Sequence, residues 1–198
     1  ILDVGCGFGK WGYLCCTNYW ETRNPERGKV PMVVGCDGFL PNVEMAGRNG
    51  CYAECLHVKF PPLPFGDRSF DTVLMVEVVE HLPDAAAAEL IDEAKRVARK
   101  RVVLSTPNFP DYRESHETIT GLNKLDAHLS YWSRSRLRQG GFEVYGCGIR
   151  PGGHRFRGAL RRLGLLPWFD GEVRRAFGSL SLVAPLLGEN TVAVWSRD

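Results

Sequence analysis

The opening stretch, Ile1 to Lys10, constrains the fold more than any other part of the sequence, because a few apolar residues are followed by Gly5, Gly7 and Gly9. The apolar residues predict a short buried strand, and Lys10 to Thr17 predicts a helix after the turn. Glycine adopts positive φ without strain and lets another molecule lie against the backbone. A strand, a glycine-rich turn and a helix in this order predict a nucleotide-binding turn in an α/β fold.

Asp3 narrows the choice of cofactor. The stretch from Gly7 to Gly12 also fits the GxGxxG pattern of dinucleotide-binding proteins. A dinucleotide, however, places its pyrophosphate over this turn, where the Asp3 carboxylate adds like-charge repulsion. A cofactor with an ammonium or sulfonium group is attracted by the same carboxylate. We therefore expect a positively charged cofactor, with an NAD(P)-dependent oxidoreductase as the alternative.

Strands and helices alternate along the chain that follows. We predict strands over Met32–Cys36, Cys51–Val58, Ser69–Val76 and Arg101–Thr106, and helices over Pro41–Arg48, Asp84–Arg99 and Ser133–Gln139. This alternation predicts parallel βαβ units. Ligands of open parallel sheets bind at the carboxyl ends of the strands. The long polar stretch from Phe109 to Tyr131 follows one of these ends, so we expect it to contribute to the site.

Two clusters of polar residues follow predicted strands. Asp37 and Gly38 end the second strand, and because a carboxylate has two acceptor oxygens, we expect Asp37 to accept both hydroxyls of a ribose. Glu77, Glu80 and His81 follow the fourth strand. We expect these three residues to form the opposite wall of the same crevice.

The opening stretch resembles motif I of class I S-adenosylmethionine-dependent methyltransferases, in which an acid precedes three alternate glycines. The string from Glu77 to Asp84, with His128 and Gly141–Val144, resembles the subgroup that contains the ubiquinone-biosynthesis O-methyltransferases. The resemblance implies an α/β, Rossmann-like, doubly wound and mostly parallel seven-stranded sheet with an antiparallel C-terminal hairpin. It also implies S-adenosylmethionine as cofactor. The residues expected to bind it are Asp3, Gly5, Gly7, Gly9, Asp37, Gly38, Phe60 and Glu77.

One position departs from the resembling family. In that family an acid after the third strand, shortly before a Leu-Pro-Phe element, reaches the adenine amino group. Here Lys59 stands at the nearest matching position, before Leu63-Pro64-Phe65. Either backbone groups near Phe60 replace the acid, or the alignment with the family differs at this point.

The second cluster has three interpretations. His81, whose imidazole titrates near neutral pH in the unperturbed state, is a candidate general base that takes the proton of an acceptor hydroxyl, with Glu80 beside it. Alternatively, Glu77, Glu80 and His81 hold Mg²⁺ or Mn²⁺, with His116 or His128 as a further ligand, as in the similar small-RNA 2′-O-methyltransferases. In the third interpretation these side chains are structural. The resemblance places His128 near the acceptor pocket, as another catalytic candidate.

The charge distribution bears on partners. The net charge is only +2, which gives no general case for a nucleic-acid partner. Residues 133–175 nevertheless contain ten arginines against three acids. Most of them fall in an insertion, 150–188, between the predicted last strands Phe142–Ile149 and Thr191–Ser196. We interpret this insertion as a lid, a site for an anionic acceptor, a peripheral membrane contact or a solvated edge.

We expect residues 1–198 to form a single methyltransferase domain. The chain begins inside a predicted strand and without Met, so we expect a further N-terminal portion. Seven cysteines without a CxxC pair indicate reduced thiols and a cytoplasmic protein, with the membrane-peripheral option through 150–188. The predicted reaction is methyl transfer to an oxygen of a small-molecule or glycan-like acceptor. A module that binds the cofactor without catalysis is a further alternative.

Overall fold

The computed structural model describes residues 1–21, 31–147 and 188–197. Its main sheet has seven strands in the order β3-β2-β1-β4-β5-β9-β8. The strands are β1 (Leu2–Val4), β2 (Val34–Asp37), β3 (Glu54–His57), β4 (Phe70–Val76), β5 (Ala98–Pro107), β8 (Glu143–Cys147) and β9 (Asn190–Ser196). β1 to β5 pair in parallel, and β9 runs antiparallel to both β5 and β8. The predicted mostly parallel sheet with an antiparallel C-terminal pair is confirmed.

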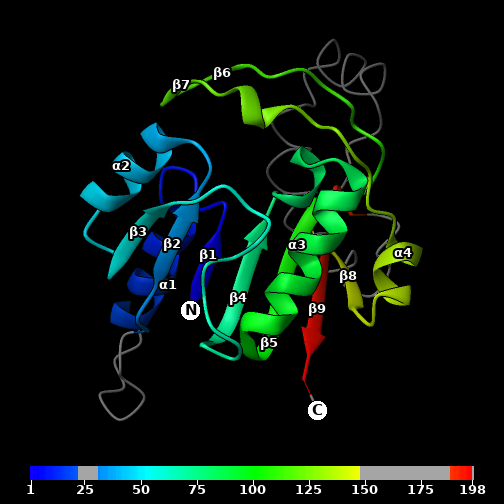
Figure 1. The fold of residues 1–198 in the computed structure, drawn as a ribbon, viewed down its shortest axis with the longest axis horizontal. Coiled ribbons are helices and arrows are strands. Elements are labelled where there is room, and N and C mark those ends of the chain that lie inside the picture. Colours follow the sequence, from blue (N-terminus) through cyan, green and yellow to red (C-terminus); the bar gives the residue numbers. More distant parts are fainter. Residues whose placement is uncertain (22–30, 148–187, 198) are drawn as a thin grey trace, which may run out of the picture.

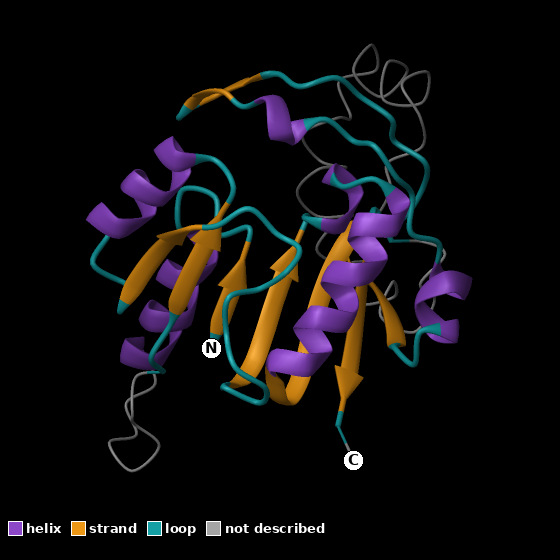
Figure 2. Cartoon of the chain, in the orientation of Figure 1, coloured by secondary structure: helices purple, strands orange, loops and turns teal. Residues whose placement is uncertain are grey.

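Helices cover both faces of this sheet. They are α1 (Lys10–Glu21), α2 (Leu40–Arg48), α3 (Asp84–Val97) and α4 (Arg134–Gln139), with short 3-10 helices η2 (Val79–His81) and η3 (Lys124–Asp126). Figure 2 shows α3 in front of the sheet and α1 behind it. The sheet is therefore doubly wound, as predicted.

The core lies between α3 and the central strands. Leu2, Met75 and Leu104 are fully buried in the neighbouring strands β1, β4 and β5. The helix buries residues spaced three and four apart along its inner face, namely Ala87, Leu90, Ile91, Ala94 and Val97. Full burial of one such leucine contributes about 1.5–3 kcal/mol, so this packing fixes the strand ends that carry the site.

The element boundaries differ from prediction at several points. α3 ends at Val97 instead of Arg99, because Ala98 takes an extended conformation (φ −75°, ψ 132°) and begins β5 directly. α1 continues four residues beyond Thr17, to Glu21. Ser133 caps α4 as its sequence suggests, since its Oγ accepts the Arg136 N–H at 3.2 Å.

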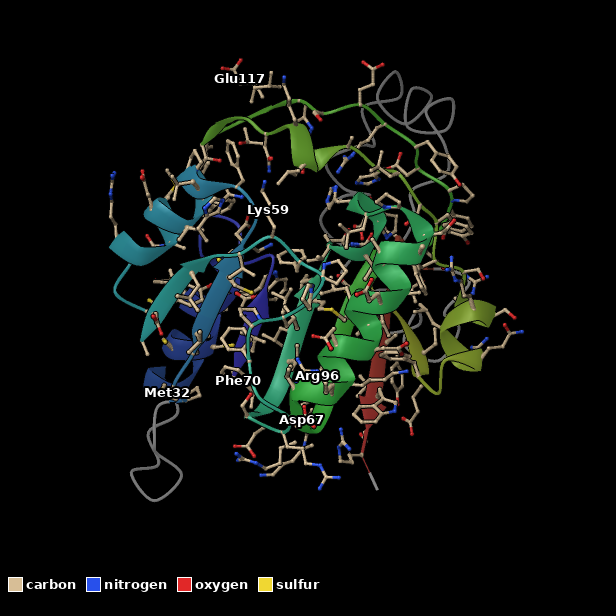
Figure 3. All side chains as sticks on the ribbon, viewed as in Figure 1. Met32, Lys59, Asp67, Phe70, Arg96 and Glu117 are labelled. Carbon is tan, nitrogen blue, oxygen red and sulfur yellow. The ribbon has the colours of Figure 1, made fainter. Side chains whose placement is uncertain are left out.

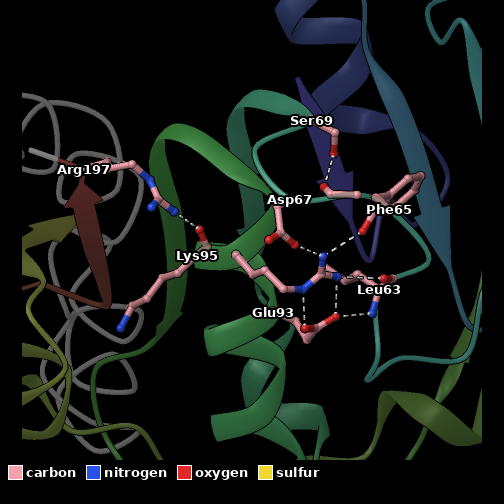
Figure 4. A network of polar contacts seen from close by, with 9 residues as sticks. Leu63, Phe65, Asp67, Ser69, Glu93, Lys95 and Arg197 are labelled. Atoms are coloured by element: carbon pink, nitrogen blue, oxygen red, sulfur yellow. Dashed lines mark hydrogen bonds and ion pairs between the residues drawn. The ribbon is translucent and has the colours of Figure 1, made fainter.

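Arg96, at the end of α3, binds the connection between β3 and β4, in which Figure 4 labels Leu63, Phe65 and Asp67. Its guanidinium donates to the carbonyl oxygens of Phe65 at 2.9 Å and Leu63 at 3.1 Å, and to Asp67 Oδ1 at 2.7 Å. Glu93 completes the network by accepting the Leu63 N–H at 2.9 Å. The basic charge at this helix end is therefore structural, and it fixes a loop that leads from the cavity back to β4.

Residues 109–132, which we call the strap, cross above the carboxyl ends of the strands (Figure 1). The strap contains a two-stranded ribbon, β6 (Glu117–Thr118) and β7 (Gly121–Leu122), followed by η3. The N–H groups of Leu129 and Ser130 donate to the Glu80 carbonyl oxygen at 2.7 and 3.1 Å, which ties the far end of the strap to η2. The long polar stretch expected to contribute to the site is thus partly ordered and covers this end of the sheet.

The arginine-rich insertion, apart from Gly188, lies outside the described residues, although β8 and β9 on either side of it are neighbours in the sheet. Among the helices of the described ranges, none has the length and apolar character needed to cross a membrane.

Candidate cofactor and active site

A cavity of about 950 Å³ lies at the carboxyl ends of the strands, between the glycine turn, η2 and the strap. It has the size of a pocket for a small ligand. The predicted site residues that line it are Gly5, Gly7, Asp37, Gly38, Phe60, Glu77 and His81. The strap adds Asn123, Leu125 and Asp126, which sequence reasoning did not single out. The structure therefore brings the two predicted clusters to opposite walls of a single cavity.

The three glycines of the turn have different roles. A Cβ at Gly7, where φ is +55°, would meet no atom within 4 Å, so this position leaves open space beside the cavity. A Cβ at Gly5 would lie 2.6 Å from Val78 Cγ2, and one at Gly9 would lie 2.6 Å from Asn49 Nδ2. Gly7 thus gives a ligand access to the backbone, whereas Gly5 and Gly9 let parts of the protein pack closely.

Tyr52, which sequence reasoning did not single out, packs its ring against two further glycines, where no side chain would fit. A Cβ at Gly12 would lie 2.2 Å from Tyr52 Cζ, and one at Gly35 would lie 2.9 Å from its Cε1. The Tyr52 hydroxyl accepts the Gly12 N–H at 3.0 Å and donates to Asp3 Oδ2 at 2.7 Å. No spacing in the sequence joins residues 3, 12, 35 and 52, so this packing is visible only in the fold.

Asp3 supports the turn from behind and does not face the cavity, contrary to prediction. Its side chain is almost completely buried, and it is absent from the cavity wall. Burial raises its pKa to about 6, although the hydrogen bond from Tyr52 acts in the opposite direction. Any effect of Asp3 on a bound cofactor therefore passes through the turn.

Asp37 lies at the end of β2, on the cavity wall, as predicted. Its Oδ2 accepts the Gly7 N–H at 2.9 Å and the Asn42 Nδ2–H at 3.3 Å, and its Oδ1 accepts the Phe39 N–H at 2.8 Å. Burial raises its pKa, and these three hydrogen bonds oppose the rise. A carboxylate offers about four acceptor positions. A single position therefore stays open, on Oδ1, where two ribose hydroxyls were expected.

Glu77 lines the cavity in a left-handed conformation, with φ of +55°. Its Oε1 accepts the Ser105 hydroxyl at 2.6 Å, and its N–H donates to the Ser105 carbonyl oxygen at 3.0 Å. Burial raises its pKa. Glu77 lies outside the short helix that contains Glu80 and His81, because η2 begins only at Val79.

His81 lies on the cavity wall and has one ring nitrogen without a hydrogen bond. Its Nδ1 lies 3.2 Å from the Ala127 carbonyl oxygen, which can only accept, so Nδ1 carries the proton in the neutral ring. Its Nε2 is then unprotonated and lies 3.8 Å from Asp126 Oδ1. Burial lowers the pKa of His81, and His128 lowers it further, against an opposing effect of Asp126. The neutral ring is therefore favoured near pH 7, with Nε2 able to accept a proton.

Glu80 and His128 lie behind His81 and are both buried. Neither is part of the cavity wall. His128 Nδ1 lies 2.7 Å from the Asp111 carbonyl oxygen, and the His81 and His128 rings meet edge to face at 4.8 Å. Among the described residues, neither the Glu80 carboxylate oxygens nor His128 Nε2 makes a hydrogen bond of 3.5 Å or less. The Glu77 carboxyl and the Thr106 hydroxyl are nevertheless close enough to Glu80 to affect its titration. Burial, followed by the charge of Glu77, raises the pKa of Glu80 to about 8.

These buried groups revise the predicted metal ligands. Ligand atoms of Glu80, His81 and His128 all lie within 4.8 Å of one another, whereas Glu77 is bonded to Ser105 and is not in this set. His116 also stays outside it, because it is exposed and its Nδ1 pairs with Asp126 Oδ2 at 2.9 Å. One carboxylate oxygen and two imidazole nitrogens at this spacing fit the donor set of a divalent cation.

Lys59 lines the cavity where the resembling family has an acid. Figure 3 shows it on the side of the sheet that the strap crosses, far from Asp67 and Arg96 at the opposite end. Phe60 lies next to it on the cavity wall, as expected.

Comparison with known proteins agrees with this geometry. Residues 1–101 match the family described as methyltransferase domain. A human protein named probable tRNA methyltransferase 9B is 37% identical over 82 residues, which are 41% of this chain and 14% of that protein. The match thus spans about a seventh of the curated relative.

Two solved structures share the fold. The magnesium protoporphyrin IX methyltransferase of Synechocystis, with bound SAH, aligns with a TM-score of 0.54 at 16% identity, over 100% of this chain and 73% of that one. A putative methyltransferase of Haloferax volcanii, in complex with the Trm112 methyltransferase activator, aligns with a TM-score of 0.57 at 19% identity, over 98% and 79%.

The glycine turn, the acid at the end of β2 and the strand order together give the Rossmann-like methyltransferase fold. The chain belongs to the methyltransferase domain family, which the match over residues 1–101 shows. The expectation of a methyltransferase is thereby confirmed, and the alternative of an NAD(P)-dependent oxidoreductase is set aside.

Proposed function

We propose that the chain binds S-adenosylmethionine in the 950 Å³ cavity and transfers its methyl group to an acceptor oxygen. The observation that carries this proposal is that both predicted clusters line the same cavity, on opposite walls. On one side, Gly7 offers an open backbone and Asp37 offers one open acceptor position on Oδ1, which also accepts the Phe39 N–H. Glu77 and His81 lie on the other side. A single cavity thus has room for a nucleoside on one wall and a proton acceptor on the other.

Methyl transfer from a sulfonium is a direct displacement, in which the S–CH₃ bond breaks as the O–CH₃ bond forms. The cofactor supplies the reactivity, and the protein orients the reactants and takes the hydroxyl proton. His81 Nε2 is the proton acceptor that we propose, because Nδ1 is held by Ala127 and the ring is neutral near pH 7. Glu80 is its neighbour in η2, and the His128 ring packs edge to face against the His81 ring at 4.8 Å.

A divalent cation is the alternative role for the same nitrogen. Glu80, His81 and His128 would hold it, and two imidazoles favour Mn²⁺ over Mg²⁺, which prefers oxygen ligands. When bound, such an ion lowers the pKa of an acceptor hydroxyl. Because His81 has a single free nitrogen, its Nε2 either takes the proton or binds the ion. The two mechanisms are therefore mutually exclusive, and chelation distinguishes them.

The acceptor that we propose is a small or glycan-like molecule with a hydroxyl group. The string from Glu77 to His81 and the position of His128 support an assignment to the ubiquinone-biosynthesis O-methyltransferase-like subgroup. A tRNA acceptor is the second candidate, favoured by the 37% identity to a probable tRNA methyltransferase. A membrane or anionic acceptor contact through 150–188 remains a separate proposal, tested by co-sedimentation with vesicles with and without anionic lipid.

Titration calorimetry with S-adenosylhomocysteine and with NADH tests the cofactor assignment. Binding of the first compound and not the second is the expected result, and the reverse contradicts the proposal. Transfer of a radiolabelled methyl group to hydroxylated small molecules, and separately to bulk tRNA, then tests the acceptor. Labelled tRNA with unlabelled small molecules would favour the second candidate. Cofactor binding without transfer to any acceptor would favour a non-catalytic module.

A further inference from the structure

The tip of the strap is joined to α2 by a side-chain hydrogen bond. β6 and β7 reverse direction at Ile119 and Thr120, and Thr120 Oγ1 donates to Asn42 Oδ1 at 2.7 Å. Asn42 is 9% exposed and lines the cavity. Figure 1 shows the ribbon reaching across the top of the sheet to α2. The tip of the strap therefore contacts a residue of the cavity wall.

Asn42 also bonds to the acid that we expect to bind ribose. Its Nδ2 donates to Asp37 Oδ2 at 3.3 Å, the oxygen that also accepts the Gly7 N–H. A carboxylate only accepts, so Asp37 fixes the amide with its nitrogen inward and its oxygen toward the strap. The Thr120 hydroxyl must then be the donor. These hydrogen bonds run in one direction, from the strap through Asn42 to Asp37.

A second contact holds the strap over the same wall. A Cβ at Gly38 would lie 3.0 Å from Leu125 Cδ1, so Leu125 packs where Gly38 has no side chain. Leu125 also lines the cavity, beside Asp37 and Gly38. The strap therefore covers the part of the cavity that contains the ribose acid.

We propose that Thr120 and Asn42 are positioning residues for the cofactor ribose, so that closure of the strap and ribose binding occur together. The strap orients Asn42, and Asn42 holds Asp37 Oδ2, which keeps the open acceptor position of Oδ1 in place for a ribose hydroxyl. This inference rests on the proposed function, because it assumes an adenosyl ligand. If closure and ribose binding occur together, the hydrogen bond between Thr120 and Asn42 breaks before the ligand leaves.

The test compares S-adenosylhomocysteine binding to the wild-type chain and to Thr120→Val, which keeps the shape of the side chain and removes its hydroxyl. We expect the Kd to rise about three- to tenfold, mainly through faster dissociation, as for loss of one hydrogen bond. Asn42→Leu should have at least this effect, and the double variant should bind no more weakly than Asn42→Leu alone. Ile119→Ala, at an exposed position of the same turn, is the matched control and should bind like wild type.

A 2′,3′-dideoxy analogue of S-adenosylhomocysteine separates ribose positioning from general closure. The effect of Thr120→Val should shrink to less than twofold with this analogue, because no ribose hydroxyl is left to position. Three results would each overturn the inference. Thr120→Val could bind S-adenosylhomocysteine like wild type, or the double variant could bind more weakly than Asn42→Leu alone. Thr120→Val could also weaken binding of the analogue as much as it weakens binding of S-adenosylhomocysteine. Failure of wild type to bind S-adenosylhomocysteine would overturn the proposed function together with it.

Discussion

The Tyr52 hydroxyl donates to Asp3 Oδ2 over 2.7 Å, while its ring fills the space that a side chain at Gly12 would need. This relationship divides the glycine-rich segment into two parts. Gly7 is open to the cavity, whereas Gly12 is closed by Tyr52. The same residue type thus serves a ligand at one position and the internal packing at another.

Alanine should therefore mainly lower stability at Gly12 and mainly lower cofactor affinity at Gly7. Gly12→Ala places a Cβ 2.2 Å from Tyr52 Cζ, which displaces the ring and leaves Asp3 without its partner. We expect it to lower the free energy of unfolding by about 2–4 kcal/mol. Gly7→Ala meets no protein atom, so positive φ alone should destabilise it by about 1 kcal/mol, while S-adenosylhomocysteine affinity falls at least about tenfold. Urea unfolding measures the loss of stability, and calorimetry measures the loss of affinity. Equal losses of stability in the two variants would contradict the different roles assigned to Gly7 and Gly12.

The raised pKa of Asp3 predicts a pH-dependent stability. The carboxyl titrates near 3.8 when unfolded and near 6 in the folded chain, so the folded state binds the proton more tightly. Stability from this group is therefore lost as the pH rises from about 4 to 6, by at most about 3 kcal/mol. Asp3→Asn removes the titration. We expect urea unfolding to show that wild type loses stability relative to Asp3→Asn across this window; a constant difference would contradict the burial argument.

The sequence predicts a site residue correctly where its place at the end of one strand is enough to put it on the cavity wall. Asp37 and Gly7 are recognisable because each follows a buried strand at the edge where parallel strands end. It failed where the contact joins distant segments. Asp3 is predicted to bind the cofactor because nothing in the sequence links it to Tyr52, whose hydroxyl is its hydrogen-bond partner in the fold. The left-handed conformation of Glu77, with φ of +55°, also follows from no local pattern. The contact between Thr120 and Asn42 depends on how a long strap folds back, which no local pattern specifies.

His81→Gln should separate chemistry from cofactor binding. If Nε2 takes the acceptor proton, turnover falls about 10²–10⁴-fold while the Kd of S-adenosylhomocysteine changes less than about threefold. Because burial lowers the pKa of His81, wild-type turnover should stay high down to pH values below the usual titration range of imidazole. His116→Gln, an exposed ring outside the cavity, is the control and should keep wild-type turnover. Loss of cofactor binding in folded His81→Gln would contradict the role.

Manganese binding distinguishes the two roles of His81. Glu80→Gln and His128→Gln each remove a ligand from the buried set, so each should weaken Mn²⁺ binding at least about tenfold if the ion is used. Glu117→Gln is the matched control, because Glu117 is exposed on β6 and lies outside this set, and it should bind Mn²⁺ like wild type. Electron paramagnetic resonance of free Mn²⁺ measures the bound fraction.

The pH dependence of that binding adds an independent check. A carboxyl must lose its proton to hold the ion, and the pKa of Glu80 is raised to about 8, so Mn²⁺ affinity should increase as the pH rises toward 8 and level off above it. Glu80→Gln should abolish this increase. Absence of Mn²⁺ binding to wild type above pH 8, with turnover unaffected by chelation, would leave proton transfer to His81 as the mechanism, since both roles need the same free nitrogen.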